Sequence, residues 1–409
     1  MRTRRTAAIA AVAAALVAGC SSATSPPSET SGAPSTATAG GATTAAPKSA
    51  HGDGDEGAID NIPWDDVGPG WTLATWTMDP YVPGNPPATD KPSDETDTTL
   101  YLVGPSGDRY PITTFPSHGS GYGPQLVDWS GDGERALLND QSVQPPTTIT
   151  VDLQTGEQTV VPIPADDRFD PRFTLPSGEA LLLTHDNGDQ PPTLERVDMK
   201  GQRELLYPTD KMGSPFAGYF LSTPDGTQLV LASNSDGVVV MGNDGTVVRT
   251  LSVPGMNYCS PARWWDEETL LVHCNSNLMD QPQLWRMPLD GGAPTALTAP
   301  NTGKGDGNAW EVPAGTFVET AWQCSSSVLE KLNPDGTTTQ VTVPGTDPGG
   351  SVFVVGVSGG DLIVRAAASC GPGEALIDYN PAENTSTVLL GPTVNGGSVT
   401  TALAYPGQE

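Results

Sequence analysis

Carboxylate and amide side chains gather in loops that follow several short apolar runs. Oxygen groups of this kind suit a hard cation or a polar ligand. The loops of any acidic chain have a similar composition, so a binding surface and simple solvation are both open readings. The richest segments are NDQSVQPP at 139–146, HDNGDQPP at 185–192, SNSDG at 233–237, CNSNLMDQPQ at 274–283 and TGKGDGNAW at 302–310. The candidate ligand-binding residues are Asp140, Asp186, Asp189, Asn234, Asp236, Asn275, Asp306 and Trp310.

The stretch WSGDGERALLND at 129–140 places acids around glycines, as a cation-binding loop or a turn between strands would. In similar stretches along the chain, Ser177, Asp225 or Ala314 stands near the position of Asp132. If these stretches bound cations, each of them would need an oxygen ligand at this position. We therefore interpret Asp132 as a turn residue.

The acidic segment HGDGDEGAID at 51–60 lacks the spacing and the closing Glu of an EF-hand calcium loop. We expect no cofactor. A structural or ligand calcium ion stays open, without a motif to support it.

Catalytic motifs give little support for an enzyme. The segment Gly356–Gly360 matches G-x-S-x-G around Ser358, but a hydrolase of that type needs an Asp and then a His further along the chain. The last histidine is His273, so that order is absent, and turn glycines explain the match. The sequence contains no P-loop, no HExxH and no zinc-type Cys/His cluster. The four histidines, His51, His118, His185 and His273, fit solvated or structural roles.

The elements that carry these loops repeat along the chain. A turn followed by an apolar run recurs at positions 70, 133, 178, 226, 267, 315 and 359, so successive units are 41 to 48 residues apart after a first interval of 63. About 20 residues inserted after Asp79 lengthen the first interval. Each unit has four short strands, which is the blade of a β-propeller. We therefore expect an all-β fold with seven blades.

The ring must close, because open sheet edges invite aggregation. The last segment, GSVTTALAYPGQE, has the form of a first strand and turn with nothing after it. The first unit has no clear inner strand of its own, apart from the doubtful NIPWDDV. We predict that Ser398 to Tyr405 supplies the missing strand of blade 1. The candidate residues then share the face that carries the loops after each second strand and between blades.

The units resemble the WD40-like (PD40) repeats of TolB-type propellers, whose marker is roughly W-S-P-D-G followed by an apolar run. Trp129 to Gly133 and Ser222 to Gly226 carry this marker. The resemblance covers about 340 residues and implies a fold, not a function. TolB has six blades and an additional N-terminal domain, for which this chain has no room, so the resemblance does not transfer its partners.

Two disulfides are expected among the four cysteines after residue 20. Cys259 lies seven residues before Asp266 and Cys274 seven residues after Glu267, so the two face each other across a hairpin. Cys324 and Cys370 follow their turns by nine and eleven residues, at matching points of blades 6 and 7. We predict the pairs Cys259–Cys274 and Cys324–Cys370.

The N-terminus has the form of a bacterial lipoprotein signal. MRTRR precedes an apolar run that ends in LVAGC, which resembles a lipobox with Cys20 as the acylated residue. Residues 20–60 form a tether rich in Ser, Thr, Ala and Pro, which cannot bury a core, and the propeller follows at 61–409. Removal of residues 1–19 takes away three Arg, so the mature charge is 16 − 48 = −32. This excess opposes nucleic-acid binding.

These observations predict a monomeric protein that is lipid-anchored at the cell membrane and faces outside the cytoplasm. The favoured function is non-catalytic binding of an envelope protein or polar ligand. The alternative is an enzyme that acts on an envelope polysaccharide, or another polar substrate, through axial carboxylates.

Overall fold

A computed structural model describes the chain from Gly52 to Pro406, and the described residues are all β-strands, loops and short 3-10 turns. The chain divides into two units, Met1–Ala45 and Ala46–Glu409, and every described residue belongs to the second. The gaps in the description are residues 78–96, 117–122, 142, 144–145, 164–167, 187, 189, 236, 278–281, 301–304, 322–326, 347–349, 368–372 and 392–396.

The strands of the first half fall into four groups of four. The first group is β28 (Ser398–Ala404), β1 (Thr72–Thr77), β2 (Thr98–Val103) and β3 (Arg109–Phe115). The second is β4 (Gln125–Trp129), β5 (Arg135–Asp140), β6 (Thr147–Asp152) and β7 (Gln158–Val161). The third is β8 (Arg168–Phe173), β9 (Ala180–Asp186), β10 (Thr193–Asp198) and β11 (Arg203–Leu206). The fourth is β12 (Phe216–Ser222), β13 (Gln228–Ser233), β14 (Val238–Gly242) and β15 (Val247–Leu251).

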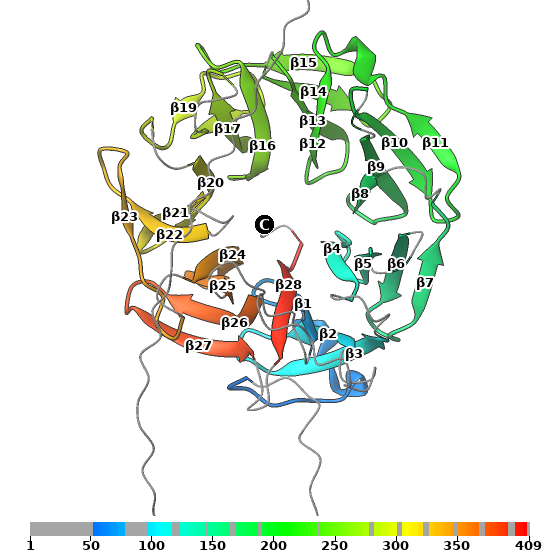
Figure 1. Ribbon diagram of the computed structural model, residues 1–409, viewed down its shortest axis with the longest axis vertical. Helices are drawn as coiled ribbons and strands as arrows, with labels where there is room; N and C mark the ends of the chain where they lie inside the picture. The colour runs from blue at the N-terminus through cyan, green and yellow to red at the C-terminus, as the bar shows by residue number, and fades with distance from the viewer. Residues whose placement is uncertain are drawn as a thin grey trace, which may run out of the picture. The chain divides into compact units, whose positions relative to one another are not determined.

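The second half supplies three more groups. The fifth is β16 (Tyr258–Trp264), β17 (Thr269–Asn275), β18 (Gln283–Pro288) and β19 (Thr295–Ala296). The sixth is β20 (Gly305–Val312), β21 (Gly315–Ala321), β22 (Ser327–Leu332) and β23 (Thr338–Gln340). The seventh is β24 (Ser351–Ser358), β25 (Asp361–Ala367), β26 (Gly373–Asn380) and β27 (Thr385–Leu390). The 3-10 turns are η1 (Ile59–Asn61), η2 (Trp64–Asp66) and η4 (Thr209–Lys211). Figure 1 shows these groups arranged in a ring, with the first strand of each nearest the centre.

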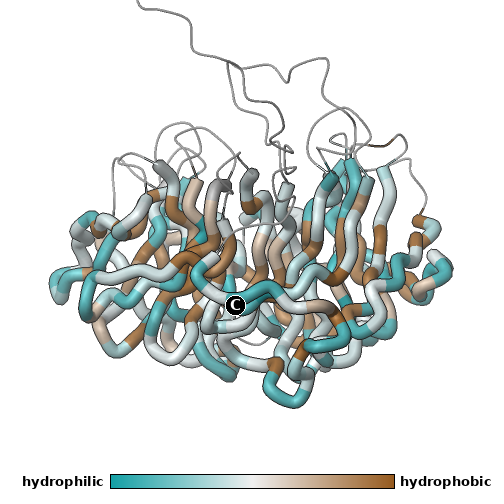
Figure 2. Tube along the Cα trace, turned by 90° about the horizontal axis from the view of Figure 1, so that it is seen from below, coloured by the Kyte–Doolittle hydropathy of each residue, from teal (hydrophilic) through white to brown (hydrophobic). Residues whose placement is uncertain are grey.

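The described strands thus form the propeller that the repeat predicts. Neighbouring strands within each blade are antiparallel. The second strands are buried on both faces; in β13, for example, Leu229, Val230, Leu231 and Ala232 are all buried. This is why their apolar runs are continuous and not alternating. In the side view, hydrophobic residues lie mainly within the strands and hydrophilic residues in many of the loops (Figure 2).

The recurring turn joins the first and second strands of a blade, as predicted. Asp132 accepts hydrogen bonds from the Ser130 hydroxyl (2.5 Å) and the Glu134 backbone N–H (3.1 Å). Asp225 does the same with Thr223 (2.6 Å) and Thr227 (3.1 Å), and these bonds, the Thr223 bond first, lower the pKa of the Asp225 carboxyl. The carboxylate stabilises the turn and is not directed at a ligand.

Strand β28 closes the ring by pairing with β1, as the sequence predicts. The register runs from Thr72 opposite Ala404 to Thr77 opposite Ser398. Val399 is fully buried, and its neighbour across the pair, Trp76, donates its indole N–H to the Gly391 carbonyl at 3.1 Å. The doubtful strand NIPWDDV is instead a segment that begins at the last residue of η1 and contains the 3-10 turn η2.

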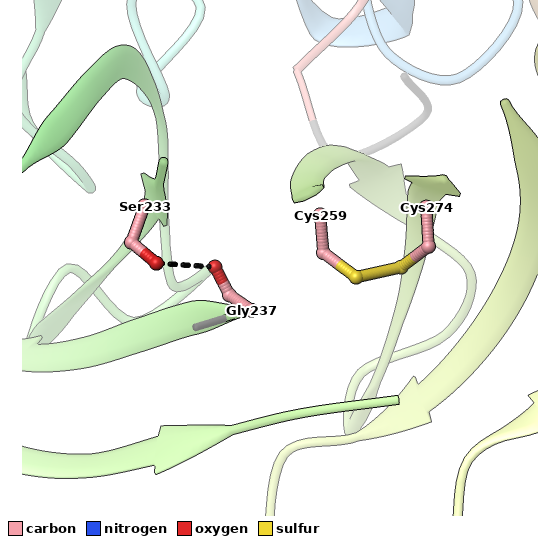
Figure 3. Close-up of a disulfide and its surroundings, with 4 residues drawn as sticks. All are labelled: Ser233, Gly237, Cys259 and Cys274. Atoms are coloured by element: carbon pink, nitrogen blue, oxygen red, sulfur yellow. Dashed lines mark hydrogen bonds between the residues drawn. A yellow bond between two sulfur atoms is a disulfide. The ribbon is translucent and has the colours of Figure 1, made fainter. Parts of the chain in front are cut away.

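The Cys259–Cys274 disulfide is confirmed (Figure 3). The two residues face each other in the β16–β17 register, with 4.2 Å between their Cα atoms, and both are buried. Cys259 also pairs with Ser233 of β13, and this pair joins blades 4 and 5 into one eight-stranded sheet. Cys324 and Cys370 lie outside the described residues, so their pairing stays a prediction.

Candidate binding site

The structure places four of the predicted residues at one end of the strands. Asp140, Asp186 and Asn275 are the last residues of the second strands β5, β9 and β17, and Asn234 directly follows β13. Because these strands occupy the same position in their blades and run in the same direction, the four residues mark the same face of the ring. Asp186 and Asn234 are exposed, Asn275 is half-buried and Asp140 is buried. Asp189 and Asp236 lie outside the described residues.

The other two predicted residues lie in strand β20 and not in a loop. The Asp306 carboxylate is 2 % exposed and accepts a hydrogen bond from the Thr298 hydroxyl at 2.5 Å. Trp310 is 3 % exposed and packs in the core between blades 6 and 7, with the Arg263 guanidinium 5.3 Å from the centre of its ring. These contacts give both residues a structural role.

A pocket of about 180 Å³ opens beside the predicted loop 185–192. Its walls come from the end of β9, from the loop itself, and from the hairpin of β10 and β11. The residues that line it are His185, Gln190, Pro191, Thr193, Glu195, Arg203 and Leu206. It therefore combines the predicted loop with strand residues that the sequence does not single out.

Glu195 holds the polar side of the pocket in place. One carboxylate oxygen accepts a hydrogen bond from Nε2 of His185 at 2.8 Å, and the other pairs with Nε of Arg203. The Glu195 side chain is only 6 % exposed, so its carboxylate is buried and needs these two partners. Each oxygen has one of these partners, so Glu195 supports both His185 and Arg203.

Arg203 is the group that this arrangement offers to a ligand. Its side chain is 62 % exposed, and among the described residues its polar contact is the one through Nε to Glu195. The terminal Nη groups are left as donors, in a fork that fits carboxylate, carbonyl or hydroxyl oxygens. Leu206, 51 % exposed, provides an apolar wall beside them.

The pocket lies at the end of the seam between blades 2 and 3. Glu195 and Val197 are two residues apart in β10, so their side chains point to the same face of the strand. Val197 packs with Leu183 against Leu137 and Val161 of blade 2. This apolar layer is close-packed and fixes the strand that carries Glu195. The site is thus positioned by the blade interface and not by the loop alone.

A bulge in β12 exposes an aromatic ring near the same loop. The register passes from the pair Phe216–Ser233 to the pair Phe220–Leu231, so residues 217–219 of β12 face a single residue of β13. Tyr219 is 66 % exposed, and a Cβ atom added to its neighbour Gly218 would lie 3.6 Å from the Pro192 side chain of loop 185–192. Bulges often redirect side chains at binding sites, and exposed tyrosines are common in them.

Glu319 is a further group that the sequence analysis does not identify. Burial raises the pKa of its carboxyl to about 8, although the Val354 N–H bond and the charges of Arg365 and Arg263 act in the opposite direction. Val354 belongs to β24, so this contact joins blades 6 and 7. In the sequence Glu319 is an isolated acid within an apolar run, which is the signal that could have identified it.

The raised pKa gives a pH-dependent contribution to stability. Because the folded pKa of Glu319 is above its unfolded value of 4.5, the contribution is fully present below that value and is lost as the pH rises through about 8. We expect the free energy of unfolding of wild type, relative to Glu319→Gln, to fall across this window in denaturant titrations. The control, Glu311→Gln, removes an exposed carboxylate of the same blade. A flat difference curve for Glu319→Gln would contradict the prediction.

No group of three or more His, Cys, Asp or Glu in the described ranges is arranged to hold a metal ion. No helix among the described residues is long and apolar enough to span a membrane.

Comparisons with known proteins show which solved structures have a similar fold. No family model and no curated protein matches the chain. The propeller domain of the Trilobed protease from Pyrococcus furiosus is 10% identical with a TM-score of 0.51, and 84% of this chain covers 96% of it. An acylaminoacyl peptidase is 11% identical with a TM-score of 0.50. The match covers 84% of this chain but only 52% of the peptidase chain. TolB from Acinetobacter baumannii is 15% identical with a TM-score of 0.39, covering 82% of this chain and 66% of TolB.

The chain is therefore a β-propeller protein. Its fold is shared with the propeller domain of the Trilobed protease. The Trilobed protease propeller is described as having an open velcro topology, whereas strand β28 closes the ring in this chain.

Proposed function

We propose that this protein is a membrane-anchored binding propeller of the cell envelope. A lipid on Cys20 holds it to the membrane, facing outside the cytoplasm, and the tether allows the ring to reach a ligand or partner. The pocket beside loop 185–192 is the binding site. The observation that carries the proposal is the Glu195 carboxylate, which fixes Arg203 with its Nη donors directed to solvent.

The contacts in this pocket favour binding over catalysis. Each Glu195 oxygen is engaged by one neighbour, and this arrangement orients His185 and Arg203 toward the pocket. Since Glu195 already compensates the charge of Arg203, and the mature chain carries a large negative charge, a strongly anionic ligand is disfavoured. A neutral or weakly charged ligand with acceptor oxygens and an apolar edge fits best, such as a sugar or a peptide segment.

The proposal is tested by removing the donor that the ligand would use. We expect Arg203→Ala to weaken binding to purified envelope material about tenfold, as loss of a hydrogen bond from a charged donor does. Lys200→Ala is the matched control, because it removes the same charge from the turn of the same hairpin, three residues before Arg203, and Lys200 does not line the pocket. If both variants bind the envelope material equally well, the result would contradict a binding site in this pocket.

The second candidate is an enzyme that acts on a polar envelope substrate. Glu319 favours it, since a carboxyl with a pKa of about 8 is protonated at neutral pH and can serve as a general acid. Release of reducing ends from envelope polysaccharide would then be lost in Glu319→Gln. Unchanged release in that variant, or none in wild type, would dismiss Glu319 as the acid.

A further inference from the structure

Residues 52–57 run across the rim of the ring where it closes. In the sequence they belong to the predicted tether, but in the structure they pair with β3, the outer strand of blade 1. The Arg109 backbone N–H donates to the Asp55 carbonyl at 2.9 Å, and the Gly57 N–H donates to the Arg109 carbonyl at 3.0 Å. Glu56 and Arg109 are partners in this parallel bridge. We call this segment the strap.

The other end of the strap is bonded to blade 7. The Asp53 backbone N–H donates to the carbonyl of Val388 in β27 at 2.8 Å. The Val388 N–H donates in return to the Asp53 carboxylate at 3.0 Å. One six-residue segment is therefore held by the outer strands of two different blades.

Arg109 secures the centre of the strap. It is 8 % exposed, donates from Nη1 to the Gly54 carbonyl at 2.7 Å, and lies 3.4 Å from the Glu56 carboxylate. A buried guanidinium is stable only when it is paired and hydrogen-bonded. Removal of the strap would leave it with neither of these partners.

The fit between strap and ring leaves no room for a side chain at two of its glycines. A Cβ atom on Gly54 would lie 2.2 Å from the carbonyl carbon of Gly107, and one on Gly52 would lie 2.4 Å from the Leu389 carbonyl oxygen. These glycines allow backbone to lie directly on backbone. The glycines of GDGDEG, a composition typical of a linker, are here required by close packing.

We propose that the strap is a second closure of the ring, which receives the load of the membrane tether. Strand β28, near the end of the chain, closes the inner part of blade 1 by pairing with β1. The strap bridges the outer strands of blades 1 and 7. A pull on the tether reaches these two blades at the strap before it reaches any inner strand. The strap also pairs with the first residue of β3, Arg109, at an edge that would otherwise be free to pair with another chain.

The test compares two glycine substitutions in the full chain. Gly54→Ala puts a Cβ into the backbone of Gly107, whereas Gly68→Ala, the matched control, adds one that meets nothing within 4 Å. We expect hydrogen exchange of the Arg109 and Val388 amides to become at least about tenfold faster in Gly54→Ala and to stay unchanged in Gly68→Ala. Equal protection of these amides in both variants would overturn the proposal.

A second measurement tests whether the strap prevents self-association through the edge of β3. A chain that begins at residue 58 is expected to self-associate in sedimentation experiments, while one that begins at residue 51 stays monomeric. If both stay monomeric with equal thermal stability, the strap is not a closure. The load on the strap rests on the membrane anchor of the proposed function, but neither experiment depends on the anchor, the ligand or the pocket, so the closure and the proposed function can fail separately.

Discussion

A chain truncated after Gly397 is expected to lose the folded ring. Strand β28 provides the inner strand of blade 1 and pairs with β1 along its whole length. The truncation removes Val399, which is fully buried, and exposes Leu73 and Trp76 on β1. At about 1.5–3 kcal/mol for each buried side chain, together with the unpaired strand, the loss approaches the whole of a typical stability of about 5–15 kcal/mol.

Circular dichroism and size-exclusion chromatography measure this loss. The truncated chain should show no cooperative thermal transition and should elute as aggregates. The control is a chain truncated after Pro406, the last described residue, which keeps all of β28 and should melt like wild type. A cooperative transition in the chain that ends at Gly397 would show that the ring does not need β28.

Replacement of both Cys259 and Cys274 by Ala is expected to lower the free energy of unfolding by about 3 kcal/mol. The disulfide links residues 15 apart in sequence, and a loop of this size loses about that much free energy of closure in the unfolded chain. Both side chains are buried, so a repacking cost adds to it. Guanidinium titrations of the oxidised wild type and the double variant measure the difference.

The reduced wild type is the control for the double variant. If the disulfide is responsible, complete reduction should bring the wild type close to the variant in midpoint. A change below about 1 kcal/mol in the double variant would contradict a stabilising role.

The architecture could be predicted because its signals are local and repeated. Each recurring turn except the one at Glu267 carries a Gly before an apolar run, and the final segment has the form of a first strand without its blade. The Cys259–Cys274 pair follows from symmetry about a single hairpin. Such features depend on neighbours within one blade, which the sequence displays directly.

The site could be predicted only in part, because its contacts depend on register between strands. Loop 185–192 was identified from its composition, but Glu195 and Arg203 are brought to it by the pairing of β10 with β9 and β11. Asp306 and Trp310 look like loop residues in sequence, and the extension of β20 buries both. The strap has the composition of a linker, and only its contacts with β3 and β27 distinguish it.

Crosslinking from inside the pocket tests the proposed binding site most directly. A photocrosslinking amino acid in place of Leu206, on outer strand β11, would be compared with one in place of Val248, which is 43 % exposed on outer strand β15 of the next blade. In intact cells we predict one envelope component crosslinked from position 206, lost when Arg203 is also changed to Ala, and absent from position 248. No product from position 206, or the same products from both positions, would contradict the account.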